Sequence, residues 1–313
     1  MTYTPILASL TIFTASLLAS CSGTKTQQTA TPSVASDSAT VVPEQVLEQV
    51  TEITDTILEN SLLNFESLTW SDSITSLLDN KSHCYINVDY PRGELTATVD
   101  SIRAWIASQF DYFTFNGDLS DGQRLIAEAG QSFIDSARND FAEFDTLDIK
   151  NISYADDYSI AALYRTDSTL TYANSMYWDR GGAHGASPFR VAVFNLNNGQ
   201  RLGWDMFQND KLDTVRLMVR NAIKTQAFET DSDEEFNEIL MLPDSVSEFP
   251  FSVQPPYFMA DGVHVVYQQY EIAPYACGLP GCTIPYSDLY DYFTPEVRRL
   301  IPEKSVAKTR SIK

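Results

Sequence analysis

The spacing of apolar residues changes along the chain, and this change most constrains the fold. Between residues 121 and 141, Leu125, Ala129, Phe133, Ala137 and Phe141 recur at every fourth position, which is the spacing of one helix face. From 148 to 178, short apolar runs alternate with expected turns at 155–157 and 166–168, a texture typical of antiparallel strands. Because strands and helices do not alternate strictly, we predict an α+β fold.

The remaining expected elements are interspersed in the same way. Two turn dipeptides, Asn198-Gly199 and Asp261-Gly262, tolerate positive φ and predict hairpins over 189–204 and 257–270. We therefore expect an antiparallel meander and hairpin sheet with packing helices between its strands. Further strands are expected at 65–72 and 83–90, further helices at 98–110, 210–225 and 231–241, and a helical or irregular segment at 286–301.

The start of the chain predicts export. The first twenty residues contain no Asp, Glu, Lys or Arg, and residues 5–20 are almost wholly apolar or small. This stretch is short for a membrane span and suits a signal peptide. It ends in Leu-Leu-Ala-Ser-Cys, which is similar to the bacterial lipobox, so we expect a lipid on Cys21 and a periplasmic or outer-membrane location at the bacterial cell envelope. An ordinary cleaved signal is the alternative.

Composition divides the rest of the chain. Residues 21–42 are rich in Ser, Thr, Ala and Gln, which cannot bury a core and predict a flexible tether after the signal peptide of residues 1–20. Residues 43–303 are long enough for one domain, or for two packed subdomains at about 43–145 and 146–303. Residues 304–313 predict a basic tail.

The chain is strongly acidic, with a formal net charge of −21 and a pI near 4.3. This charge argues against nucleic acid, because neutralising phosphates requires a basic face. It permits a cationic protein partner. The alternative is that the acidic surface serves solubility alone.

Two cysteines lie in the sequence Cys277-Gly-Leu-Pro-Gly-Cys282. In an oxidising compartment we expect them to form a disulfide across this turn. Cys84 shares an alternating face with Ile86, Val88 and Tyr90, so we expect a buried strand residue.

Two segments supply the candidate binding residues. Residues 180–186, Arg-Gly-Gly-Ala-His-Gly-Ala, present His184 on a tight, exposed backbone path where Gly182 lets a ligand approach the backbone. The alternative is a structural connection between strands. Downstream, Tyr270, Glu271 and Tyr275 suit a groove for a glycan or peptide, or equally a packed loop whose Glu271 accepts backbone hydrogen bonds.

Catalysis, metals and cofactors are not expected. The sequence has no Gly-x-Ser-x-Gly turn, which argues against a serine nucleophile. An envelope hydrolase that uses His184 and Glu271 is the alternative function. The acidic residues between 229 and 238 lack the glycine of a Ca²⁺ loop, and acidic residues at a helix start are favourable.

Several motifs recur in an order that resembles a known family. The motifs are 84–91, 181–185, 194–199, 270–275 and 284–289. They are similar to uncharacterised domains shared with the extracellular part of the anti-sigma-V factor, a lysozyme-sensing regulator, over about 60–300. The resemblance implies a receptor for a cationic protein such as lysozyme, without catalysis. A cell-wall glycan is the other expected ligand, from the candidate groove residues. In this chain a lipobox stands in place of the regulator's transmembrane helix.

Overall fold

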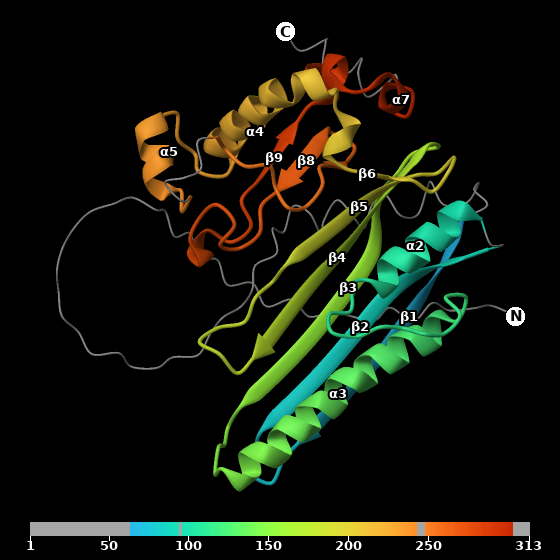
Figure 1. Cartoon of the computed structure of the whole chain (residues 1–313), viewed down its shortest axis with the longest axis vertical. Helices are drawn as coiled ribbons and strands as arrows, with labels where there is room; N and C mark the ends of the chain where they lie inside the picture. Colours follow the sequence, from blue (N-terminus) through green and yellow to red (C-terminus); the bar gives the residue numbers. More distant parts are fainter. Residues whose placement is uncertain (1–62, 94–95, 243–247, 303–313) are drawn as a thin grey trace, which may run out of the picture. The chain divides into compact units, whose positions relative to one another are not determined.

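The computed structural model describes residues 63–93, 96–242 and 248–302. The predicted signal peptide 1–20, Cys21, the tether 21–42 and the tail 304–313 lie outside these residues. Within the described part of the chain, no helix is both long and apolar enough to cross a bilayer. Helices and strands are interspersed, which confirms the α+β fold class (Figure 1).

A six-stranded sheet organises the structure, with its strands in the order of the chain. All neighbouring strands are antiparallel except β2 and β3, which are parallel. The exception arises because two helices carry the chain back along the sheet before β3 begins. The sheet therefore joins strands from both sides of residue 145. Its strands are β1 (Asn64–Thr75), β2 (Lys81–Arg92), β3 (Ser153–Arg165), β4 (Thr169–Arg180), β5 (Phe189–Asn195) and β6 (Arg201–Leu202).

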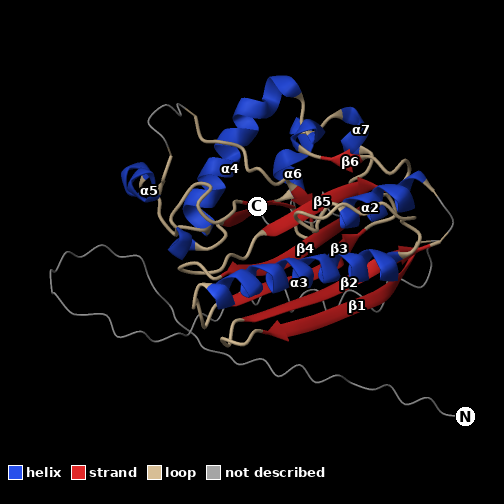
Figure 2. Ribbon diagram, turned by 60° about the horizontal axis from the view of Figure 1, so that its bottom comes forward, coloured by secondary structure: helices blue, strands red, loops and turns tan. Residues whose placement is uncertain are grey.

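The two crossover helices, α2 (Ala97–Ala107) and α3 (Gly122–Thr146), cover one face of this sheet (Figures 1 and 2). Each begins at a side-chain cap: Thr96 accepts from the Val99 amide at 3.2 Å, and Asp121 accepts from the Arg124 amide at 3.0 Å. The four-residue spacing predicted for 121–141 becomes the buried face of α3. Its fully or nearly buried apolar residues are Leu125, Ile126, Ala129, Ile134, Ala137 and Phe141.

A second core lies against the opposite face of β4 and β5. Side chains alternate across these strands, so Tyr172 and Phe194 pack under α2 while Ala173 and Val193 join the second core. The hydroxyl of Thr171 donates to the carbonyl of Phe258 at 2.7 Å and ties the two sheets together. This core also contains the three-stranded sheet β7 (Tyr257–Phe258), β8 (Val263–Val266) and β9 (Gly281–Ile284), with helices α4 (Leu212–Gln226), α5 (Asp233–Ile239), α6 (Tyr286–Leu289) and α7 (Pro295–Arg298).

The turn predicted at residues 155–157 is wrong, because all three residues lie inside β3. Asp156 is buried there and pairs with Arg180 from β4. A strand can hold this carboxylate only because its partner comes from the neighbouring strand, which local composition does not reveal. The turn at 166–168 is confirmed: the Thr166 hydroxyl accepts from the Ser168 amide at 3.1 Å.

Candidate functional site

The loop of residues 181–188 joins β4 to β5 and carries the predicted His184. At two positions of this loop, steric crowding requires a glycine. Gly181 has a φ of 71°, and a Cβ there would lie 2.8 Å from Cγ2 of Ile152; at Gly185 it would lie 2.5 Å from the Tyr177 hydroxyl. At Gly182 the nearest atom would be 4.0 Å away. Space around the backbone therefore does not require a glycine at this predicted site residue.

His184 contacts both predicted tyrosines, Tyr270 and Tyr275. Its ring lies 4.0 Å from the Tyr275 ring, centroid to centroid, and its Nε2 lies 3.1 Å from the Tyr270 hydroxyl. Nδ1 lies 2.9 Å from the carbonyl oxygen of Gly185. Because a carbonyl only accepts, Nδ1 carries the proton, and in the neutral ring Nε2 accepts from Tyr270. We call His184, Tyr270 and Tyr275 the aromatic cluster.

The aromatic cluster forms because the segment after β8 docks on the loop after β4. The Tyr275 hydroxyl donates to Gly185 O at 3.0 Å. Side-chain amides of Gln268 and Gln269 pair with the backbone of Phe189 and Ser187, at 2.9–3.0 Å. Tyr270 nevertheless stays 54% exposed and has a φ of 66°. A bulky residue in this left-handed region is uncommon, and such strain is concentrated at functional sites.

Glu271 does not share the role predicted for its neighbours. Its carboxylate accepts from the amide of Val253 at 2.7 Å and from the amide of Gln268 at 2.7 Å, one with each oxygen. Burial raises the pKa of this carboxyl, and the two backbone hydrogen bonds act against that rise. Glu271 therefore holds two loop segments together, which is the packed-loop alternative.

The predicted disulfide is not formed: among the described residues, no disulfide joins Cys277 and Cys282. Cys282 lies on β9 with its side chain in the second core, and Cys277, which ends a short 3-10 turn before Gly278, packs against the same core. Burial raises the pKa of the Cys282 thiol to about 12. The pairing of β9 with β8 fixes the position of Cys282, and closeness to Cys277 in the sequence does not reveal that pairing. Cys84 is buried on β2 as predicted.

The acidic segment before α5 starts a helix. The Ser232 hydroxyl accepts from the amide of Glu235, and Asp233 pairs with Arg220 and Lys224 of α4 at 2.8 and 2.9 Å. These partners lower the pKa of the Asp233 carboxyl. Among the described residues, no group of three or more His, Cys, Asp or Glu side chains is arranged to hold a metal ion.

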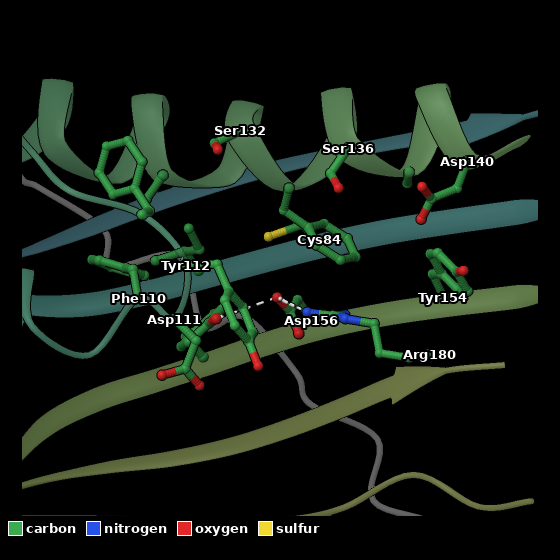
Figure 3. Close-up of a pocket in the computed structure, with 16 residues that line it drawn as sticks. Cys84, Phe110, Asp111, Tyr112, Ser132, Ser136, Asp140, Tyr154, Asp156 and Arg180 are labelled. Atoms are coloured by element: carbon green, nitrogen blue, oxygen red, sulfur yellow. Dashed lines mark hydrogen bonds and ion pairs between the residues drawn. The ribbon is translucent and has the colours of Figure 1, made fainter. Parts of the chain in front are cut away.

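A cleft that the sequence analysis missed lies between α3 and the sheet (Figure 3). Its volume is about 220 Å³. Ser132, Ser136 and Asp140 reach it from α3, and Asp156 and Arg180 reach it from the strands below. We call this space the α3 cleft.

Asp156 is the most deeply buried charged group of the α3 cleft, with 6% of its side chain exposed. Its Oδ2 lies 2.9 Å from Nη2 of Arg180 and accepts from the Tyr158 hydroxyl at 3.2 Å. Its Oδ1 is buried and has no hydrogen-bond partner among the described residues. Burial raises the pKa of the Asp156 carboxyl, whereas Arg180 and Tyr158 act to lower it.

One sequence signal could have identified this cleft. Tyr154, Asp156 and Tyr158 alternate with other residues along β3, so they share one face of the strand. An aspartate between two tyrosines on a strand face indicates a partnered carboxylate more than a turn. The partner Arg180 could not be identified, because the register between β3 and β4 is not visible in the sequence.

Comparison with known proteins identifies an uncharacterised domain. Residues 204–287 match the family described as "Protein of unknown function (DUF3298)". This stretch includes Tyr270, Glu271 and Tyr275, whereas His184 and the α3 cleft precede it. Among curated proteins, none matches the chain.

Two solved structures are similar to this one. A member of the DUF3298 family from Bacteroides fragilis superposes with a TM-score of 0.64 at 20% identity, covering 76% of this chain and 97% of that one. A DUF3298 family protein from Pseudomonas aeruginosa has a TM-score of 0.52 at 16% identity, covering 77% and 98%. At these identities the likeness concerns the fold. Neither description mentions an anti-sigma factor or a lipoprotein.

Proposed function

We propose that this chain is a binding module that recognises an extracytoplasmic ligand through the aromatic cluster, without catalysis. The carrying observation is the exposure of Tyr270 on a strained backbone, beside the rings of His184 and Tyr275. Rigid aromatic side chains with a polar edge are well suited to protein and glycan recognition, because they bury a large area at a small entropic cost.

A cationic protein such as lysozyme is the proposed ligand, with a cell-wall glycan as the second candidate. The motif resemblance to the lysozyme-sensing domain and the net charge of −21 support a cationic partner. The hydrolase alternative is weaker, because both oxygens of Glu271 already accept backbone hydrogen bonds.

Attachment to the cell envelope through a lipid on Cys21 belongs to the same proposal. An anchored domain would hold a captured ligand at the membrane surface. The test is incorporation of labelled fatty acid when the full-length chain is expressed in a bacterium. Incorporation should be lost in the Cys21→Ala variant, and labelling of that variant equal to the parent would contradict the anchor.

The binding proposal is tested by immobilising the full-length chain and titrating lysozyme and soluble peptidoglycan fragments. We expect saturable lysozyme binding that weakens with salt, because exposed charges are screened over about 8 Å at 0.15 M. Tyr270→Ala should weaken it about tenfold or more. Tyr85→Ala removes another half-exposed tyrosine on β2 and is the matched control.

Two results would contradict this proposal. The first is no saturable binding of either probe. The second is binding that Tyr270→Ala and His184→Ala leave unchanged while both variants remain folded. Tyr270→Phe separates the contributions, since it keeps the ring and removes the hydroxyl that His184 contacts.

A further inference from the structure

The α3 cleft has an exposed rim and a buried floor. Ser132, Ser136 and Tyr112 stand at its rim, and all three are exposed. The floor is formed by buried residues of the sheet and of α3, namely Cys84, Ile86, Ala129, Ala137, Asp156 and Tyr158. Its volume of about 220 Å³ is well above the roughly 10–15 Å³ that one water molecule needs. The cleft is therefore open to solvent and sized for a small molecule.

The α3 cleft carries a net negative charge. Three aspartates and one arginine line it. Asp111 is neutralised from outside, where Arg190 contacts both of its oxygens at 3.0 and 2.7 Å, and Asp156 pairs with Arg180. Asp140 has no cationic partner among the described residues, and its carboxylate contacts the phenol of Tyr154. One carboxylate charge thus remains uncompensated.

The floor also lacks a donor. Oδ1 of Asp156 is buried without a hydrogen-bond partner, and leaving such an acceptor unpaired is costly in free energy. A ligand that completes this site must bring an N–H or O–H group. An anion would bring only acceptors and would face Asp140, so the charge and the hydrogen-bond inventory both disfavour it.

The walls are aromatic. One of these rings already makes a cation–π contact within the protein, since Cζ of Arg180 lies 4.6 Å from the ring centre of Phe133. Tyr112, at the rim, is fully exposed and has a φ of 60°, a second aromatic residue with an uncommon backbone conformation. The aromatic lining residues are Phe110, Tyr112, Phe113, Phe133, Tyr154 and Tyr158.

We infer that the α3 cleft binds a small organic cation, namely a primary amine on a short carbon chain. Its ammonium donates to the carboxylate of Asp156, the uncompensated charge of Asp140 adds electrostatic attraction, and its carbon atoms pack against the aromatic walls. A neutral alcohol of the same shape satisfies the hydrogen bonds but not the charge, and it should bind less tightly. The site is separate from the aromatic cluster, so it does not depend on the function proposed for that cluster.

The test titrates n-butylammonium into the isotope-labelled full-length chain and follows backbone amide shifts by NMR. We expect saturable shifts around Cys84, Ser132, Ser136 and Asp156, and weaker or no shifts with n-butanol. The absence of saturable shifts up to ~10 mM amine, or equal affinity for the alcohol, would overturn the inference.

Variants then locate the site. Asp140→Asn removes the uncompensated charge, and Ser136→Leu occludes the rim; each should weaken amine binding about tenfold or more. Asn139→Leu makes the same kind of change at an exposed α3 position outside the cleft lining and is the matched control. Asp156→Asn is a third variant, and the test does not depend on its folding. Unchanged affinity in both Asp140→Asn and Ser136→Leu would place the amine elsewhere and refute the cleft.

Discussion

The hydroxyl of Tyr270 lies 3.1 Å from Nε2 of His184, although 86 positions separate the two residues in the sequence. The opposite ring nitrogen lies 2.9 Å from the carbonyl oxygen of Gly185. His184 is thus held from both sides, by its own loop and by the segment that follows β8. The contact makes one exposed surface from two distant motifs.

This geometry predicts the tautomer of His184. The neutral ring should carry its proton on Nδ1, because the Gly185 carbonyl can only accept. The ¹⁵N shifts of the two nitrogens, measured on the neutral ring, distinguish the two tautomers. In Tyr270→Phe the tautomer should persist, since the carbonyl remains. A ring protonated on Nε2 in the parent chain would contradict the observed contacts.

Neighbouring glycines should differ in their tolerance of alanine. Gly181→Ala should cost about 1–2 kcal/mol of unfolding free energy, because a side chain at φ 71° is strained. Gly182→Ala should change it by about 0.5 kcal/mol or less, since no atom crowds that position. Urea unfolding of the two variants measures the difference. Equal losses would show that the left-handed backbone at Gly181 is not the cause.

Glu271→Gln should destabilise the fold by about 1.5–3 kcal/mol, because an amide offers one acceptor oxygen where two backbone amides need acceptors. Glu238→Gln makes the same change at an exposed position of α5 and should be nearly neutral. Thermal or urea unfolding compares them. If Glu271→Gln kept full stability, its carboxylate would be available for a role other than holding loops together.

Removal of Arg180 should destabilise the protein in a pH-dependent way. In Arg180→Gln the Asp156 carboxyl loses its cationic partner, so its pKa in the folded state rises further. The folded state then holds more protons than the unfolded state between the two pKa values, and stability falls as pH rises through that window. Because the Arg180 side chain is 36% exposed, we expect a loss of about 2 kcal/mol at pH 7, below the ~3–5 kcal/mol typical of broken buried pairs.

Urea unfolding at about pH 4.5 and pH 7 tests this expectation, with the smaller loss at the lower pH. Arg138→Gln is the matched control, since Arg138 is an exposed α3 residue that pairs with Asp135. That pair should contribute about 0.5 kcal/mol or less. Equal losses for Arg180→Gln at both pH values would contradict a shifted Asp156.

The cysteine chemistry is directly measurable. Alkylation of the unfolded chain without prior reduction should modify Cys84 and Cys282, because the structure contains thiols at both positions. Peptide mass spectrometry reports each site. A disulfide between Cys277 and Cys282 would leave both unmodified, and its reduction would then lower the unfolding free energy by roughly 2 kcal/mol.

Local patterns were sufficient where a segment's own residues decide its conformation. The α3 stripe, the Asn198-Gly199 turn and the buried face of Cys84 depend on spacing and turn chemistry. Predictions from local patterns were wrong where a residue distant in the sequence determines the conformation. The expected turn at 155–157 is strand because Arg180 neutralises Asp156, and Cys282 is a buried strand residue because β9 pairs with β8.

The sequence by itself therefore determined the fold class, the main helix and the motif residues His184, Tyr270 and Tyr275, since these depend on periodicity and residue type. The tertiary structure decided which of them meet. It separated Glu271 from the cluster by occupying both its oxygens with backbone amides, and it assembled the α3 cleft from β2, β3, β4, α3 and residues 110–113. The physical reason is that burial and charge pairing depend on strand register and helix packing, which join residues that are far apart in the chain.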